Sequence, residues 1–216
     1  MSESLSEPLG DRVVVPEVHD SAVVFTGKVW NIRRDRFVLT DGDSSHEIVR
    51  EYMDHTGAVA VLAMDDDGRV LLIRQYRHPV RSAELELPAG LLDVAAEDPL
   101  TAAKRELAEE VDLVASQWDL LCEFVSSPGG SNEALRVYLA RGISAAPEIF
   151  ERTEEEAGIE LIWTSLDDAV DAVLGRRAQN SILAIAILTA KLESERGWAG
   201  LGDATAPWPR HPSNLA

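Results

Sequence analysis

The most informative part of the sequence is GLLDVAAEDPLTAAKRELAEEVDL, residues 90–113. It begins as a glycine-led loop and continues as a helix with a well-marked start, because Asp98 can cap the helix and Pro99 can occupy its first position. Apolar side chains then recur at helical spacing, at Leu100, Ala103, Leu107 and Val111. The pattern predicts an amphipathic helix that ends near residue 111.

The same helix carries three acidic residues close to its C-terminal end. Glu106 and Glu110 are four residues apart and Glu109 lies three beyond Glu106, so their carboxylates share about a third of the helix circumference. Like charges at this spacing repel, and acids in the last turns oppose the helix macrodipole, each by roughly a few tenths of a kcal/mol. A solvated acidic face is one interpretation. The other is a cation site, since Mg²⁺ binds carboxylates, bridges them to phosphates and can activate water.

The spacing around these acids closely resembles the Nudix box, in which a glycine and a glutamate precede an Arg-Glu-hydrophobe-x-Glu-Glu core. The matching positions are Gly90, Glu97, Arg105, Glu106, Leu107, Glu109 and Glu110. Two positions depart from the pattern: Gly90 and Glu97 are separated by one residue more than usual, and Asp112 replaces the glycine that normally follows the helix. Aspartate tolerates a left-handed helix end, so we interpret both departures as variations in loop geometry.

Other segments resemble the ADP-ribose pyrophosphatase branch of that family. RQYRHPVRSAELELPAG, residues 74–90, is similar to the branch's approach to the box, and Pro128 stands about where the branch has a marker proline. A β-rich N-terminal segment and Gln179-Asn180-Ser181 at the start of the last helix fit as well. The resemblance covers roughly residues 22–195. It implies Mg²⁺-dependent hydrolysis of ADP-ribose to AMP and ribose 5-phosphate.

The resemblance also implies a role for each matching residue. The metal ligands would be the carboxylates of Glu106 and Glu110 and the backbone carbonyl of Ala89, with Glu109 assisting both as a ligand and as a catalytic residue. The cation would be Mg²⁺, with Mn²⁺ as the alternative. Arg105 would orient the glutamates. The substrate-binding residues would be Arg77, at the diphosphate, together with Glu86 and Pro128.

Three further assignments each keep a plainer alternative. Trp30 aligns with an aromatic position near the adenine in relatives, but a core aromatic is an equally good interpretation. Arg34, beside Arg33, is a candidate substrate contact or a surface residue. Glu155, with Glu156 next, lies where the branch often carries its general base on a mobile loop; composition alone favours a solvated charge run.

The order of the segments predicts an α+β fold or a mixed-sheet sandwich. The resemblance implies a Nudix-type α/β/α sandwich with a mixed sheet, preceded by a small antiparallel β N-terminal domain. We expect a flexible lead at residues 1–12 and a β-rich segment at residues 13–52 that contributes to dimerisation and to the substrate site. The hydrolase domain would span residues 53–196, with helices near 165–175 and 180–195. Residues 197–216 would form an irregular tail.

The amino-acid composition limits the classes of molecule that the protein can bind. A formal net charge of −18 excludes general nucleic-acid binding, which needs a basic surface. Three of the 20 basic residues are lysine, so arginine supplies the other 17; this suits phosphate binding but equally reflects a GC-rich genome. The longest apolar run is too short for a membrane span, and no secretory signal is recognisable. We expect a cytoplasmic protein in which the single cysteine, Cys122, is a buried thiol rather than a nucleophile.

We therefore expect a hydrolase acting on a small nucleoside diphosphate derivative, without nucleic-acid or membrane partners. The resemblance implies a homodimer in which the N-terminal segment of each chain helps to build its partner's site. Three alternatives stay open: a pyrophosphatase for another nucleotide sugar or a dinucleotide, a non-catalytic ligand sensor on the same scaffold, and an acidic interaction protein.

Overall fold

The computed structural model describes residues 9–42, 44–150 and 158–214. The chain divides into two compact units, residues 1–53 and residues 54–216. Most of the lead expected at residues 1–12, namely residues 1–8, lies outside the described residues.

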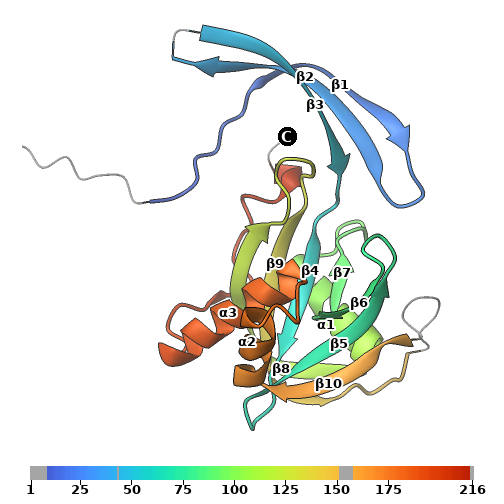
Figure 1. Ribbon diagram of the computed structural model, residues 1–216, viewed down its shortest axis with the longest axis vertical. Helices are drawn as coiled ribbons and strands as arrows, with labels where there is room; N and C mark the ends of the chain where they lie inside the picture. The colour runs from blue at the N-terminus through green and yellow to red at the C-terminus, as the bar shows by residue number, and fades with distance from the viewer. Residues whose placement is uncertain (1–8, 43, 151–157, 215–216) are drawn as a thin grey trace, which may run out of the picture. The chain divides into compact units, whose positions relative to one another are not determined.

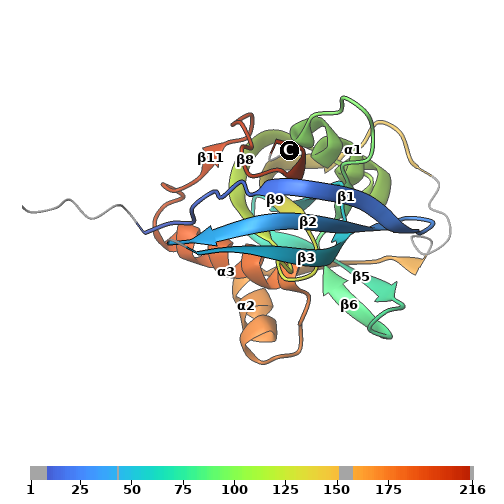
Figure 2. The same ribbon diagram turned by 90° about the horizontal axis from the view of Figure 1, so that it is seen from above.

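The first unit is a three-stranded sheet with the order β1-β2-β3, seen side by side in Figure 2. Its strands are β1 (Glu17–Thr26), β2 (Asn31–Asp41) and β3 (Ser44–Asp54). The turn from β1 to β2 requires a glycine: the Gly27 N–H donates to the Trp30 carbonyl over 3.0 Å, and a Cβ on Gly27 would lie 2.2 Å from that oxygen. The antiparallel β N-terminal sheet expected from the sequence is confirmed.

The second unit contains two sheets. The five-stranded sheet has the order β11-β8-β9-β4-β7 and is mixed, because β4 pairs with β9 in parallel and with β7 antiparallel. The three-stranded sheet has the order β10-β5-β6. The strands are β4 (Ala58–Ala63), β5 (Arg69–Arg77), β6 (Ser82–Glu86), β7 (Ala89–Leu91), β8 (Leu113–Val125), β9 (Ala134–Ala145), β10 (Glu160–Ser165) and β11 (Gly202–Asp203).

Helices cover both faces of the five-stranded sheet (Figure 1). The helices are α1 (Pro99–Val111), α2 (Leu166–Leu174) and α3 (Ser181–Glu195). Along β4, Val59 and Val61 pack in one cluster with the apolar stripe of α1, whereas Ala60 and Leu62 pack in another cluster with α2 and α3. This alternation follows from the two-residue period of a strand. The expected α/β/α sandwich of the α+β class is confirmed.

Helix α1 begins and ends as its sequence predicts. The Asp98 carboxylate accepts from the backbone N–H groups of Leu100 and Thr101, over 3.1 and 3.0 Å, and Pro99 is the first helical residue. Asp112 closes the helix in the left-handed conformation, with φ of 56°. The family pattern places a glycine here because a side chain is strained in this conformation.

The C-terminal tail, expected to be irregular, packs closely against the second unit. Strand β11 pairs with β8, and a single 3-10 turn, η2 (Pro212–Asn214), follows. The buried Arg136 side chain donates to the carbonyls of Ala206 and Pro207, and its guanidinium lies 4.8 Å from the centre of the Trp208 ring. His211 Nε2 lies 3.0 Å from the Thr56 carbonyl oxygen. The tail is therefore held at several points.

None of the helices in the described ranges is both long and apolar enough to cross a membrane.

Asp112 gives a test of the helix end. Asp112→Gly and Asp112→Ala both lose the carboxylate that accepts from the Phe150 N–H, but only Asp112→Gly also removes the left-handed strain of a Cβ. We expect the free energy of unfolding of Asp112→Ala to be lower than that of Asp112→Gly by about 1 kcal/mol. Urea denaturation of both variants and the parent measures this. Equal stabilities of the two variants would contradict the interpretation.

Candidate active site

Strand β7 and helix α1 bring the predicted metal ligands together. Ala89 lies on β7 opposite Ala60 of β4, which fixes its backbone against the core. The buried carboxylate of Glu110 accepts from the Ala89 N–H over 2.9 Å. Four residues earlier on the same helix, Glu106 lies against Gly90. Two carboxylates of α1 and the backbone of β7 thus share one small region.

Gly90 is required by the close approach of Glu106. A Cβ on Gly90 would lie 2.0 Å from both Cδ and Oε1 of the Glu106 carboxylate, far inside van der Waals contact. Only a residue without a side chain lets the helix carboxylate approach the strand so closely. This gives a physical reason for the glycine that begins the box.

Arg105 joins the acidic residues into one network. Its guanidinium donates to Glu97 through Nε and Nη2, over 3.0 and 2.9 Å. Its Nη1 donates to Glu106 over 2.6 Å and to Glu109 over 2.9 Å. Pairing with Arg105 lowers the pKa of the Glu97 carboxyl. The pair with Glu97, followed by Glu106 and Glu109, raises the pKa of Arg105 further above its ordinary value. The predicted orienting role of Arg105 agrees with these contacts.

The loop before α1 absorbs the additional residue between Gly90 and Glu97. Ala96 adopts a left-handed conformation with φ of 63°, and the Glu97 N–H donates to the Val94 carbonyl over 3.2 Å. The turn brings the Glu97 carboxylate onto Arg105 despite the longer loop.

Arg77 and Glu86, predicted to bind substrate, bond to each other. Arg77 Nε donates to Glu86 Oε1 over 2.9 Å, and Nη2 donates to Oε2 over 2.7 Å. The Glu86 side chain is 6% exposed and that of Arg77 is 41% exposed. The bidentate pair therefore fixes one edge of the guanidinium on a buried carboxylate and leaves Arg77 partly open to solvent.

The remaining predicted residues are placed as follows. Pro128 is exposed in the loop between β8 and β9. Trp30 is half-buried in the first unit, and Arg34 is exposed there and donates to Glu51 through Nε over 2.8 Å. Glu155 and Glu156 lie outside the described residues. The prediction that Cys122 is not a nucleophile fits its environment, since burial raises the pKa of the thiol to about 11.

The donor set suits a hard divalent cation. Within residues 9–42, 44–150 and 158–214, no three His, Cys, Asp or Glu side chains form a ready-made metal cage. Mg²⁺ does not need one, since it keeps several waters and completes its shell with substrate phosphates. The carboxylates of Glu106, Glu109 and Glu110 and the backbone carbonyl of Ala89 are oxygen donors that could hold such a cation. The absence of a side chain on Gly90 lets the Glu106 carboxylate lie against the strand.

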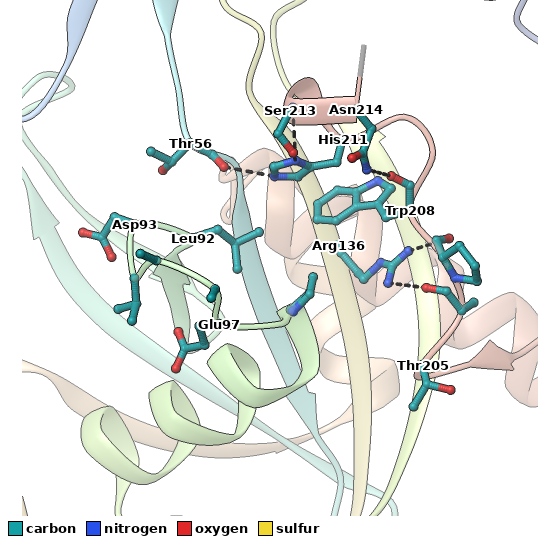
Figure 3. A pocket seen from close by; sticks show the side chains of 16 residues that line it. Thr56, Leu92, Asp93, Glu97, Arg136, Thr205, Trp208, His211, Ser213 and Asn214 are labelled. Atoms are coloured by element: carbon teal, nitrogen blue, oxygen red, sulfur yellow. Dashed lines mark hydrogen bonds between the residues drawn. The ribbon is translucent and has the colours of Figure 1, made fainter. Parts of the chain in front are cut away.

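A separate cavity of about 650 Å³ lies between the loop before α1 and the C-terminal tail (Figure 3). The cavity is lined mainly by the loop before α1 and by tail residues such as Thr205, Trp208 and His211. Of the acidic residues bonded to Arg105, Glu97 also lines the cavity. Glu106, Glu110, Arg77 and Glu86 do not line it. The carboxylate region is therefore distinct from this cavity.

Comparison with known proteins identifies the family. The NUDIX domain model matches residues 54–184, more than half of the chain and nearly all of the region that carries these contacts. The chain belongs to the Nudix family. An ADP-ribose pyrophosphatase of Mycobacterium tuberculosis is 41% identical over 172 residues, 80% of this chain and 81% of that protein.

Two further similarities extend this result. A methanol dehydrogenase activator of Bacillus methanolicus is 34% identical over 170 residues, 79% of this chain and 89% of that protein. A solved structure described as an ADP compounds hydrolase superposes with a TM-score of 0.70 at 20% identity, covering 88% of this chain and 99% of that one. The last similarity shows the Nudix fold alone.

Two features of this Nudix site were not assigned roles from the sequence. Glu97 was recognised as part of the box, but its bidentate bond to Arg105 depends on the loop turn at Ala96. Gly90 was recognised as a motif glycine, but its contact with Glu106 depends on how α1 packs on β7. The fixed spacing of the box was the available signal for both.

Gly90→Ala tests the contact with Glu106. The new Cβ must displace the Glu106 side chain, which is flexible, so we expect catalytic turnover to fall roughly 100-fold with little change in the free energy of unfolding. Gly200→Ala is the matched control, because its Cβ would lie 2.6 Å from the carboxylate of Glu193, outside the site. Steady-state kinetics and urea denaturation measure both. Equal turnover of the two variants would refute the role of Gly90.

Proposed function

We propose that this Nudix protein hydrolyses the pyrophosphate bond of ADP-ribose, giving AMP and ribose 5-phosphate, with Mg²⁺ as its cation and Mn²⁺ as the alternative. The observation that carries the proposal is the arrangement of Glu106 and Glu110 against the β7 backbone, with Arg105 bonded to Glu97, Glu106 and Glu109. A solvated acidic face would not need a glycine beneath one carboxylate, nor a buried carboxylate bonded to a strand.

The protein's own groups have distinct tasks in this reaction. Glu106, Glu109, Glu110 and the Ala89 carbonyl would hold the cation, which when bound polarises phosphoryl oxygens and activates water. Arg105 keeps Glu106 and Glu109 oriented while it offsets their mutual repulsion. Arg77, fixed by Glu86, would bind the diphosphate with the part of its guanidinium that is open to solvent.

The general base is proposed from the sequence, as Glu155 with Glu156 as the alternative. Both precede β10, whose first residue, Glu160, accepts from Arg74 Nη1 over 2.6 Å. Arg74 and Arg77 lie on the same strand, β5. The antiparallel pairing of β10 with β5 brings the start of β10 to the strand that carries Arg77, which supports a base supplied from the segment before β10.

The substrate is proposed from the relatives together with the site. The Mycobacterium tuberculosis relative is named an ADP-ribose pyrophosphatase, and it matches four fifths of this chain. The Bacillus methanolicus relative is named an activator of a dehydrogenase, which keeps a regulatory role and other nucleotide substrates as alternatives. The intact set of Glu106, Glu109 and Glu110 favours cleavage over binding alone, and the bonded pair of Arg77 and Glu86 supports a diphosphate substrate.

A product assay with a substrate panel tests the proposal. With saturating Mg²⁺, we expect AMP and ribose 5-phosphate to be released from ADP-ribose much faster than sugar phosphates from other nucleotide sugars or nucleotides from dinucleotides. The reverse ranking would support a different pyrophosphatase. Binding of ADP-ribose without any cleavage would support the sensor alternative and would contradict the proposal.

Glu110→Gln supplies the metal control for this assay. We expect turnover to fall by orders of magnitude while the fold is kept, because the amide has lost its charge but still offers an oxygen to the Ala89 N–H. Glu193→Gln is the matched variant, since Glu193 is also buried and accepts from the Gly200 N–H over 2.8 Å. Unchanged activity of Glu110→Gln at the same Mg²⁺ requirement would refute the metal role.

We further propose that the protein is a homodimer joined through the first unit. A three-stranded sheet is too thin to bury a core by itself, and every residue of β1 is exposed. Its large apolar side chains include Val23, Val24 and Phe25, exposed by 43%, 42% and 62%. Apolar surface of this kind typically marks an interface between proteins.

Phe25→Glu tests the dimer. A carboxylate at this position would have to be buried without a partner in the interface, so we expect the variant to dissociate to monomers. Leu174→Glu is the matched control, because Leu174, at the end of α2, is 63% exposed. Light scattering coupled to size exclusion measures both masses. A Phe25→Glu protein that stays dimeric at the same concentration would contradict the proposed interface.

A further inference from the structure

A buried histidine, His55, lies at the start of the second unit and bonds at both ring nitrogens. Its side chain is 2% exposed. The Gly57 N–H donates to Nδ1 over 2.9 Å, so the ring proton must be on Nε2, which lies 3.2 Å from Glu133 Oε1. The ring is thus a neutral imidazole that donates to Glu133. Burial lowers the pKa of His55, opposed in part by the charge of Glu133, and the lowered pKa agrees with the neutral form.

Glu133 in turn closes the loop between β8 and β9. Its second oxygen, Oε2, accepts from the Ser126 hydroxyl at the other end of the loop, and the Ser126 N–H donates to the Glu133 carbonyl over 3.3 Å. Within the loop, the N–H groups of Gly130 and Ser131 both donate to the Ser127 carbonyl over 3.0 Å. Residues 126–133 therefore form a closed loop, and Pro128 is exposed within it.

A second set of bonds ties the same loop to the same segment. The His55 N–H donates to Asn132 Oδ1 over 2.7 Å, and Asn132 Nδ2 donates to Asp54 Oδ1 over 3.2 Å. On the other side, the Leu92 N–H donates to the Gly57 carbonyl over 3.0 Å. The segment at residues 54–57 thus connects the loop with the end of β7, the strand that carries Ala89.

We propose that His55 is a positioning residue, which through Glu133 fixes the loop at residues 126–133 and thereby sets where Pro128 meets the substrate. The inference rests on the proposed function, with Pro128 in contact with the substrate as the family resemblance implies. His55 touches no reacting atom. Its effect is to hold the loop relative to β7, the strand that carries Ala89.

Two substitutions separate the bonds of the ring. His55→Gln places an amide N–H near the position of Nε2 and retains a donor for Glu133, whereas His55→Asn retains an acceptor for Gly57 but does not reach Glu133. We expect His55→Asn to raise KM for ADP-ribose roughly tenfold with little change in kcat. We expect His55→Gln to stay closer to the parent in KM. A structural role alone would lower the amount of folded enzyme and hence the apparent kcat, without changing KM.

A second readout does not depend on the reaction. Hydrogen exchange at the Gly130 and Ser131 amides reports the closure of the loop, and we expect it to be faster in His55→Asn than in His55→Gln. This measurement stands even if ADP-ribose is not the substrate, so a failure of the proposed function is distinguishable from a failure of the positioning role.

Glu133→Ala keeps the test open if His55→Asn does not fold, since the Glu133 side chain is 22% exposed and lies just outside β9, which begins at Ala134. It should raise KM and the loop exchange rate as His55→Asn does, and the double variant should show no further increase in either. Additive effects, a lower kcat with KM unchanged, or loop exchange equal to that of the parent would overturn the inference.

Discussion

The arrangement of the acidic residues in the site depends on the positive charge of one side chain, that of Arg105. Arg105 lies among Glu97, Glu106 and Glu109 and donates to each of them, so acids that would repel one another along one helix are held in a fixed arrangement. A bidentate bond to Glu97 restricts the guanidinium more than a single contact would. The arginine therefore holds these carboxylates in one arrangement, and through Glu97 it connects the loop before α1 with the helix.

Local sequence patterns were sufficient to predict where helix α1 begins and ends and which of its faces is buried. The Asp98 cap, the Pro99 start and the left-handed Asp112 are each determined by residues within one or two helical turns. The apolar stripe of α1 correctly predicted its buried face. The spacing of the box drew attention to Glu106 and Glu110, whose carboxylates lie against Gly90 and Ala89 of β7 in the structure. The family resemblance implied that Arg77 and Glu86 both contact the substrate, and these two residues bond to each other in the structure.

Contacts between distant segments were beyond the reach of the sequence. His55 bonds to a residue 77 positions later, and Arg136 to one 70 positions later. No periodicity in a single sequence reports such pairs, because each depends on how strands β4, β8 and β9 are ordered in the sheet. The tail illustrates the same limit: its prolines and tryptophans predicted irregular backbone, yet Trp208 is buried against Arg136.

The bond between His211 and Thr56 joins residues 155 positions apart in the chain. Gly57, next to Thr56, has φ of 87°, and a side chain there would collide with the His211 ring. The absence of a side chain at Gly57 therefore allows the C-terminal tail to pack against the start of the second unit. During synthesis the strand that begins at Ala58 emerges long before the tail that packs beside it. The start of the second unit therefore gains this contact only after the segment around His211 has also left the ribosome.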